Sequence, residues 1–368
     1  MRLAQLWLTD FRCYRSLEVD LPDGVTVIVG DNGQGKTSLL EAVGWTATGR
    51  SFRGVPDAAL VREGTEQAVL RAEVEHAGRV QLLEAELRAT GRNRVRVNHQ
   101  PVQRRRDLLG LLRVTVFAPD DLQLVKGSPG ARRDYLDTLL VAIAPRYEAA
   151  CSDFDKVLRQ RNALLRTRAR DPADLDTLVV FDEQLIGAGG EVVRGRLALI
   201  EQLTPEVAAA YQALAGDDPG IDAVYEAPWA DTTTLGRDEV EAQLRTALAA
   251  HRRQELDRGV TLVGPHRDEW RLHVRGLDAR SHASQGEQRT LALALRLAGH
   301  RVCTDAVGEE PVLLLDDVFS ELDPHRAAAL VAHLDLGHQT LITTAASVPP
   351  DVKPDRRMRV VAGRVEDA

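Results

Sequence analysis

A glycine-rich loop that follows an apolar run and opens a helical pattern constrains the fold of this chain most. The run Val25–Val29 has the length and β-branched composition of a buried strand, and residues 38–43 have the pattern of a helix. The loop fits G-x-x-x-x-G-K-[ST] and comprises Gly30, Asp31, Asn32, Gly33, Gln34, Gly35, Lys36 and Thr37. In this context the backbone N–H groups at the helix N-terminus cradle phosphate oxygens. The loop therefore predicts a phosphate-binding site in an α/β domain.

Two side chains of this loop carry chemistry of their own. The Lys36 ammonium would neutralise the β- and γ-phosphates of a nucleotide, and the Thr37 hydroxyl would bind Mg²⁺. Lysine occurs at only four positions in a chain rich in arginine, and one of the four is in this loop. ATP and Mg²⁺ are accordingly the expected cofactors.

A second apolar run ends in two carboxylates. Residues 312–315 have the composition of a buried strand, and Asp316 and Asp317 follow directly. Asp316 fits the role of holding Mg²⁺, and Asp317 is placed to polarise the attacking water as a general base. Alone, the pattern fits an ordinary strand end equally well; together with the glycine-rich loop it predicts ATP hydrolysis.

The segment Ser284-Gln285-Gly286-Glu287-Gln288 opens an apolar helix and resembles the signature motif of ABC-type ATPases. Residues 320–324 resemble the D-loop of the same proteins. The Ser284 hydroxyl and the Gly286 amide would form an anion site, which in this superfamily closes on the γ-phosphate held by the other subunit. The alternative is that Ser284 simply caps the helix.

The spacing of the motifs distinguishes between branches of this superfamily. About 250 residues separate Lys36 from Ser284, whereas only about 30 separate Ser284 from Asp316. Apolar residues recur every three or four positions over about 132–165 and 175–203, which predicts two helices with a break at residues 171–172. A transporter ATPase would place its signature much closer to the loop. The long, mostly helical insert resembles that of the SMC and Rad50 branch, although it is far shorter.

We therefore predict an α/β fold: an ABC-type P-loop ATPase lobe with a mixed sheet and flanking helices, plus a mostly helical second lobe with a short antiparallel helical arm. Residues 1–118 would form the first part of the ATPase lobe and residues 119–260 the helical lobe. Residues 261–368 would complete the ATPase lobe with the signature motif, the catalytic acids and the D-loop. Residues 216–236, rich in Gly, Asp, Pro and Thr, are expected to form a loop.

Several further blocks make the chain resemble one family nearly end to end, the bacterial RecF recombination mediators. Besides the P-loop, the signature and the catalytic acids, these blocks are LTDFRCY (8–14), GRSFR (49–53), FAPDDL (117–122), LVKGSP (124–129) with Arg132 and Arg133, and VGPHRD (263–268). The resemblance implies an ATP-dependent homodimer that binds duplex DNA and junctions between duplex and single strand. It also implies partnership with RecO and RecR in placing RecA on gapped DNA.

Two departures from the transporter pattern bear on the rate of hydrolysis. The signature lacks the double glycine, and Thr343 and Thr344 stand where transporter ATPases place a switch histidine. A hydroxyl can hydrogen-bond the γ-phosphate but does not titrate near neutral pH. We expect slow, DNA-stimulated hydrolysis. Gln123 is the candidate for the glutamine that contacts Mg²⁺ and water at the lobe junction, unless it is an ordinary exposed glutamine on a helix.

The charge distribution bears on DNA binding. The net charge is −8, so basic residues do not coat the whole surface, but two stretches concentrate them. The stretch 155–170, at the end of the helical arm, is one. The other contains Arg92, Arg94, Arg96, Arg104, Arg105 and Arg106 without an acid. Such clusters favour contacts to the DNA backbone over base readout, although a solvated charged face is the alternative. Aromatic residues make up only 4% of the chain, so a base-stacking platform is not expected.

The remaining composition narrows the class of protein. Cys13, Cys151 and Cys303 are widely spaced and lack a C-x-x-C motif, so neither a disulfide framework nor a zinc site is expected. No apolar stretch is long enough to span a membrane, and we expect a cytoplasmic protein without a membrane partner. Two rival functions stay open: a transporter-type ATPase subunit, which the long insert disfavours, and a P-loop scaffold that does not hydrolyse ATP, which Asp317 and Ser284 disfavour.

Overall fold

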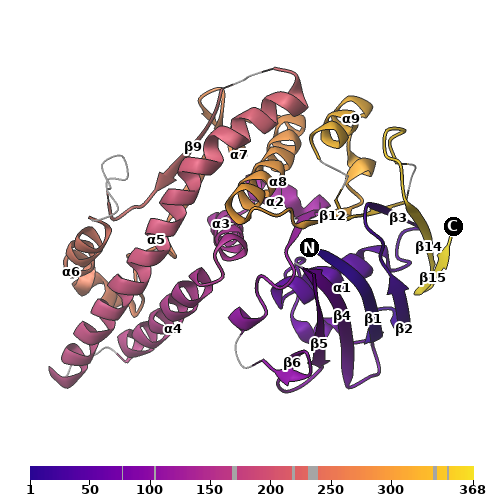
Figure 1. Ribbon diagram of the computed structural model, residues 1–368. Coiled ribbons are helices and arrows are strands. Elements are labelled where there is room, and N and C mark those ends of the chain that lie inside the picture. Colours follow the sequence, from indigo (N-terminus) through magenta and orange to yellow (C-terminus); the bar gives the residue numbers. More distant parts are fainter. Residues whose placement is uncertain are drawn as a thin grey trace. The chain divides into compact units, whose positions relative to one another are not determined.

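The structure is a computed structural model that describes residues 1–76, 78–102, 105–167, 172–217, 220–230, 239–334, 338–345 and 348–368 (Figure 1). It divides into two compact units. Unit 1 comprises Met1–Leu122, Ala209–Asp217 and Thr290–Ala368, and unit 2 comprises Gln123–Ala208 and Asp218–Arg289. The predicted boundary at residue 260 differs from this division. Residues 261–289 remain in unit 2 because β10 (Glu269–Val274) pairs along its whole length with β9 (Ile221–Glu226).

In one sheet of unit 1, one strand leads into the glycine-rich loop and another ends at the two acids. Among the described residues its order is β15-β14-β3-β13-β12-β8, parallel except where β15 pairs antiparallel with β14. Its central strands β12 and β13 are buried along their whole length, which explains the unbroken apolar run before Asp316 in β12. The strands are β3 (Val25–Val29), β8 (Val114–Phe117), β12 (Val312–Asp316), β13 (Thr340–Thr344), β14 (Arg356–Val361) and β15 (Arg364–Asp367).

The second sheet of unit 1 is antiparallel and has the order β2-β1-β4-β5-β6-β7. Its strands alternate buried and exposed residues, and a bulge between Leu3 and Gln5 of β1 lets both Leu3 and Leu6 face the core. The strands are β1 (Arg2–Phe11), β2 (Tyr14–Asp20), β4 (Gln67–His76), β5 (Arg79–Arg88), β6 (Arg94–Val97) and β7 (Gln100–Pro101).

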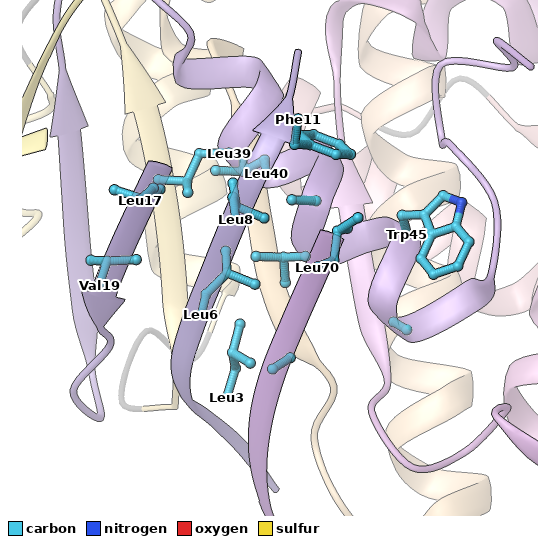
Figure 2. Close-up of a cluster of buried hydrophobic side chains, with 14 of the residues drawn as sticks. Leu3, Leu6, Leu8, Phe11, Leu17, Val19, Leu39, Leu40, Trp45 and Leu70 are labelled. Carbon is cyan, nitrogen blue, oxygen red and sulfur yellow. The ribbon is translucent and has the colours of Figure 1, made fainter. Parts of the chain in front are cut away.

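The core of unit 1 lies between this antiparallel sheet and α1 (Lys36–Thr48). Figure 2 shows Leu6 and Leu8 of β1 close to Leu39 and Leu40 of α1, and all four are almost completely buried. Each such leucine contributes about 2 kcal/mol on burial. This packing fixes the helix that begins at Lys36. The remaining helices of unit 1 are η1 (Asp57–Leu60), η2 (Arg105–Asp107), η3 (Pro119–Leu122), η4 (Val318–Glu321), α9 (Pro324–His333) and most of α8 (Gln285–Val307).

Unit 2 is mostly helical, and with the mixed sheet of unit 1 it confirms the predicted fold class. One predicted helix, over residues 132–165, is in fact two, because the chain breaks at Ala144 and Pro145 cannot donate a backbone hydrogen bond. The predicted loop at 216–236 is wrong in part, since it contains β9. The helices are α2 (Gln123–Lys126), α3 (Pro129–Ile143), α4 (Tyr147–Arg166), α5 (Pro172–Ala215), α6 (Val240–Arg258) and α7 (Ala279–His282); β11 (Leu277–Asp278) completes the sheet β11-β10-β9.

A buried charge network changes the interpretation of the basic stretch 155–170 as a DNA-binding surface. Arg161 of α4 is fully buried, donating to Asp182 of α5 at 2.8 Å and to Glu255 of α6 at 2.6 Å. Arg161 therefore ties three helices together and is not available to DNA. Removing one partner of such a network costs about 3–5 kcal/mol, because the other charges stay buried.

The other basic residues of the stretch 155–170 are either exposed or outside the described residues. Lys156, Arg159 and Arg166 are exposed on α4. Arg168 and Arg170 lie outside the described residues. Arg161 therefore does not contribute to the positive surface charge that the sequence predicts at the end of the arm.

His266 of unit 2 is half-buried. Its Nε2 atom faces Thr261 O at 3.2 Å, its ring lies against Phe154, and its buried Nδ1 atom has no hydrogen-bond partner among the described residues. Burial lowers the pKa of His266 to about 4. Asp268, two residues on, is buried, and burial raises its pKa to about 6 against the hydrogen bonds from Tyr225 and Trp229.

We predict that His266→Gln lessens the loss of stability on acidification. The unfolded state binds a proton at His266 near pH 6.5 and the folded state only near pH 4, so stability is lost as the pH falls through that window. Asp268 acts in the opposite sense, because its folded-state pKa lies above the unfolded value. Between pH 7 and 5 the free energy of unfolding of the variant should fall by about 1–2 kcal/mol less than that of the wild type.

Urea denaturation at both pH values measures this difference. His325→Gln, at an exposed histidine of α9, is the control and should behave as the wild type. Equal losses for all three proteins would contradict the assignment.

Candidate nucleotide-binding site

The glycine-rich loop connects β3 to α1 and is held from two sides. Tyr14 of β2 donates from its hydroxyl to Gly35 O at 2.9 Å, and the backbone N–H of Ala362 donates to Gln34 Oε1 at 2.6 Å. Gly35 has a φ of 118°, and a Cβ atom there would lie 2.5 Å from Cys13 Sγ. The backbone at this position therefore requires glycine.

Lys36 is the first residue of α1 and is almost buried, with 6% of its surface exposed. Its Nζ atom donates to Gly30 O at 2.7 Å and to Asp31 O at 3.0 Å. The ammonium group thus lies across the glycine-rich loop, and its contact with the β- and γ-phosphates stays a prediction.

The structure brings Thr37 and Asp316 together although 279 positions separate them. The Thr37 hydroxyl donates to Asp316 Oδ1 at 2.8 Å, and the Thr343 hydroxyl of β13 donates to the same oxygen at 2.7 Å. Asp316 is 5% exposed, and burial raises its pKa against these two hydrogen bonds. A hydroxyl and a carboxylate in contact offer the hard oxygen ligands that suit Mg²⁺.

Asp317 is held in an unusual backbone conformation beside Asp316. Its φ of 51° is left-handed, and its N–H donates to Thr343 O at 3.0 Å. Its side chain is half-buried, and Ser320 of the predicted D-loop donates to Asp317 Oδ1 at 2.5 Å. The carboxylate is therefore oriented by a neighbouring hydroxyl, as a general base requires.

These residues line one pocket of about 530 Å³ within unit 1, a volume in the range of small-molecule sites. Asn32, Gly33, Gly35, Lys36, Thr37, Asp316 and Asp317 are among its lining residues. Eight others received no role from the sequence: Arg12, Cys13, Ser38, Phe52, Arg53, Ala118, Pro119 and Asp120. All but Ser38 lie in one of the family blocks, and that position was the available signal.

Arg12 is fixed by a buried carboxylate. It forms two hydrogen bonds with Glu41 of α1, at 2.9 and 3.0 Å, and Ser51 donates to the same carboxylate at 2.5 Å. The blocks at 8–14 and 49–53 therefore converge on α1 and form one wall of the pocket.

Ser284 belongs to unit 2 and caps α8. Its Oγ atom accepts from the N–H of Glu287 at 3.3 Å, and Glu287 Oε2 accepts from the N–H of Ser284 at 2.8 Å, which together form a capping box. These hydrogen bonds lower the pKa of Glu287, which also pairs with Arg275. The alternative of a capping serine is therefore confirmed. Binding of a γ-phosphate by Ser284 and Gly286, which lie at the exposed start of a 23-residue helix, stays a prediction.

Gln123 is the first residue of α2 and is exposed. From the segment before it, Ala118, Pro119 and Asp120 line the pocket, and Gln123 is not among the lining residues. Its role at the lobe junction stays a prediction, and Asp120 is the polar residue that this segment contributes to the described pocket.

The predicted arginine surface is partly neutralised. Arg94 and Arg96 are exposed on β6, but they stand opposite Glu86 and Glu84 of β5, and Arg94 lies 4.0 Å from Glu86. Arg92 lies before β6 begins and is therefore not part of this strand. Glu84 and Glu86 precede the basic stretch and lie just outside its bounds, which is why a charge count over residues 92–106 missed them.

The second half of that stretch is described in part. Arg106 lies 3.9 Å from Asp107, Arg105 belongs to η2, and Arg104 lies outside the described residues.

In the part of the chain that the structure describes, no helix is long and apolar enough to cross a membrane.

The fold and the site define a class, the P-loop ATPase heads of the SMC type. An SMC head bound to the C-terminal winged-helix domain of ScpA is 16% identical, covers 100% of this chain and 97% of its own, and superposes with a TM-score of 0.57, which shows the shared fold. The family model described as the RecF/RecN/SMC N terminal domain matches residues 2–352.

Two comparisons narrow the class to one family. The DNA replication and repair protein RecF of Frankia alni is 48% identical over 99% of both chains, and that of Streptomyces avermitilis is 46% identical over the full length of both. A solved structure of the recombination mediator RecF with ATP has a TM-score of 0.93 and 29% identity, covering 100% of this chain and 97% of its own. The chain belongs to the RecF family, the ATP-binding ATPases that act as recombination mediators in DNA replication and repair.

We predict that Gly35→Ala abolishes nucleotide binding, whereas Gly33→Ala weakens it far less. Both glycines have positive φ, so alanine costs about 1–2 kcal/mol of backbone strain at either. A Cβ atom at Gly35 also meets Cys13 and Tyr14, while at Gly33 it meets no atom within 4 Å. Equilibrium binding of a fluorescent ATP analogue measures the difference, and equal losses in the two variants would contradict this geometry.

Proposed function

We propose that this chain is an ATP-driven, DNA-binding recombination mediator that works as a homodimer. In this proposal ATP joins two copies, the dimer binds duplex or gapped DNA, and slow DNA-stimulated hydrolysis ends the bound state. The observation that carries the proposal is the hydrogen bond between Thr37 and Asp316, which places the P-loop hydroxyl and the strand-end carboxylate together in the wall of the pocket.

We assign each residue of the pocket a separate role in ATP hydrolysis. Thr37 and Asp316 would hold Mg²⁺, which when bound neutralises the charge that develops on the phosphates. Lys36 would exchange its contacts with Gly30 and Asp31 for the β- and γ-phosphates. Asp317, oriented by Ser320, would accept a proton from the attacking water.

Dimerisation would complete each site. Ser284 is exposed and lies in unit 2, whereas the pocket lies in unit 1. A second copy could present its Ser284 and Gly286 to the γ-phosphate, so two copies would enclose two nucleotides. Slow turnover fits such an arrangement, because hydrolysis would wait for the copies to meet.

The partners follow from the solved relatives, which act in the RecFOR pathway. On that basis we propose RecO and RecR as partners and the placing of RecA on gapped DNA as the outcome, with a preference for junctions between duplex and single strand. A bacterial protein with this task would work in the cytoplasm, where the DNA is.

The two rival functions are less well supported. A transporter-type ATPase subunit would carry its signature close to the P-loop, whereas here unit 2 intervenes. A scaffold that binds nucleotide without hydrolysis would have no use for an oriented carboxylate at Asp317. Fast turnover without DNA in a steady-state ATPase assay would count against the slow, DNA-stimulated hydrolysis proposed here.

We predict that ATP converts the wild type from monomer to dimer and that Lys36→Met and Ser284→Arg each prevent this. Lys36→Met removes the phosphate contact, and Ser284→Arg fills the anion site that would receive the γ-phosphate held by the opposite copy. An equal mixture of the two variants should regain dimers in part, since one of its two sites then keeps both residues. Gel filtration with light scattering and ATPγS measures the association.

The control is Ser16→Arg, at an exposed serine of β2, which should dimerise normally. If ATP leaves the wild type monomeric, or if the mixture behaves as the separate variants do, the composite site is wrong.

We predict that replacing Arg92, Arg94 and Arg96 together with alanine weakens duplex binding and flattens its dependence on salt. Each lost phosphate contact lowers the slope of log K against log salt by about 0.9. Arg15→Ala, at an exposed arginine of β2 at the other end of the same sheet, is the matched control. Fluorescence anisotropy over a salt series on duplex, gapped and single-stranded DNA measures both quantities. An unchanged slope in the triple variant would remove these arginines from the DNA surface.

A further inference from the structure

Thr343 has a position that connects the two halves of the nucleotide site. It lies in β13, the strand between β12 and β3, and its side chain is completely buried. In the register of the sheet it stands beside Asp316 of β12 on one side and Ile28 of β3 on the other.

The Thr343 hydroxyl contacts both catalytic acids. It donates to Asp316 Oδ1 at 2.7 Å and accepts from the backbone N–H of Asp317 at 3.1 Å. The same N–H also donates to Thr343 O at 3.0 Å. One threonine therefore fixes the side chain of the first acid and the main chain of the second.

These contacts leave the hydroxyl little capacity for a phosphate. A hydroxyl has one proton to donate, and the close Asp316 oxygen is the better acceptor than Leu315 O, which lies at 3.5 Å. The sequence suggested that a threonine in this strand could contact the γ-phosphate in place of a histidine. For Thr343 the structure directs the hydroxyl to the acids instead.

Two hydroxyls converge on one carboxylate oxygen. Thr37, at the start of α1, and Thr343, in β13, approach Asp316 Oδ1 at 2.8 and 2.7 Å. Two donors on one oxygen restrict rotation of the carboxylate, which sets the direction of its second oxygen. Asp317, in its left-handed conformation, likewise depends on what holds its N–H.

We propose that Thr343 is a positioning residue for ATP hydrolysis, which holds the Asp316 carboxylate for Mg²⁺ and the Asp317 backbone for activation of water. The inference rests on the proposed function, since it assigns Thr343 to the same site. It adds a residue whose action passes through both acids and that touches neither the nucleotide nor the metal.

The test compares Thr343→Val and Thr343→Ala, which lack the hydroxyl, with Thr343→Ser, which keeps it. Thr26 of β3 provides the matched control, because it is also fully buried, lies beside Leu341 of β13, and has an Oγ1 atom without a partner among the described residues. Binding of a fluorescent ATP analogue is measured in EDTA and over a Mg²⁺ titration, and kcat is measured at saturating Mg²⁺.

We expect Thr343→Val and Thr343→Ala to raise the Mg²⁺ concentration for half-maximal binding about tenfold, the size expected from losing a hydrogen bond to a charged group. Binding in EDTA should change less than about twofold, and kcat should fall even when Mg²⁺ saturates. Thr343→Ser should restore both quantities, and Thr26→Val should match the wild type. In an Asp316→Asn background, Thr343→Val should have no further effect on the Mg²⁺ requirement.

Three results would overturn the inference: equal behaviour of Thr343→Val and Thr26→Val, equal losses in EDTA and in Mg²⁺, or failure of Thr343→Ser to restore the Mg²⁺ requirement. If the wild type itself binds ATP without any effect of Mg²⁺, the proposed catalytic site fails, and the inference fails with it. The wild-type titration therefore separates the two failures.

Discussion

Parallel pairing of β3, β13 and β12 is the constraint on which the site depends. Because the strands run in the same direction, the loop after β3 and the acids after β12 emerge at one edge of the sheet, with β13 between them. The strands are buried on both faces, so their order cannot shift without exposing apolar surface. The hydrogen bonds from Thr37 and Thr343 to Asp316 are consequences of this arrangement, as is the pocket in front of them.

The sequence was sufficient where local chemistry decides the structure. The P-loop and the strand-end acids lie where their motifs place them, because glycine spacing and buried apolar runs are local signals. It was insufficient where distant segments meet. Nothing near Asp316 indicates Thr343 as its partner, since this pair is made by the register of two parallel strands. The strand β9 was missed because glycine and proline around it resemble a loop.

The roles of the basic residues likewise depend on contacts that the local sequence does not reveal. A count of charges along the chain treats every arginine alike, yet Arg161 is buried among carboxylates and Arg12 is fixed by Glu41 at the pocket, while Lys156 is exposed. The first stabilises unit 2, the second shapes a nucleotide site, and the third is free to meet solvent or a polyanion. Burial and partners, and not the number of basic residues, decide which of these tasks a basic side chain performs.

The position of β3 in its sheet has a consequence for the chain as it leaves the ribosome. Both strands that flank β3 are made about 300 residues after it, and the turn that contacts Gln34 is made later still. A nascent chain therefore holds the P-loop sequence long before it has the partners that shape the loop, and such long-range contacts form slowly. ATP binding should appear only near the end of synthesis, so incomplete chains would carry an unformed nucleotide site and could not compete for the partner copy.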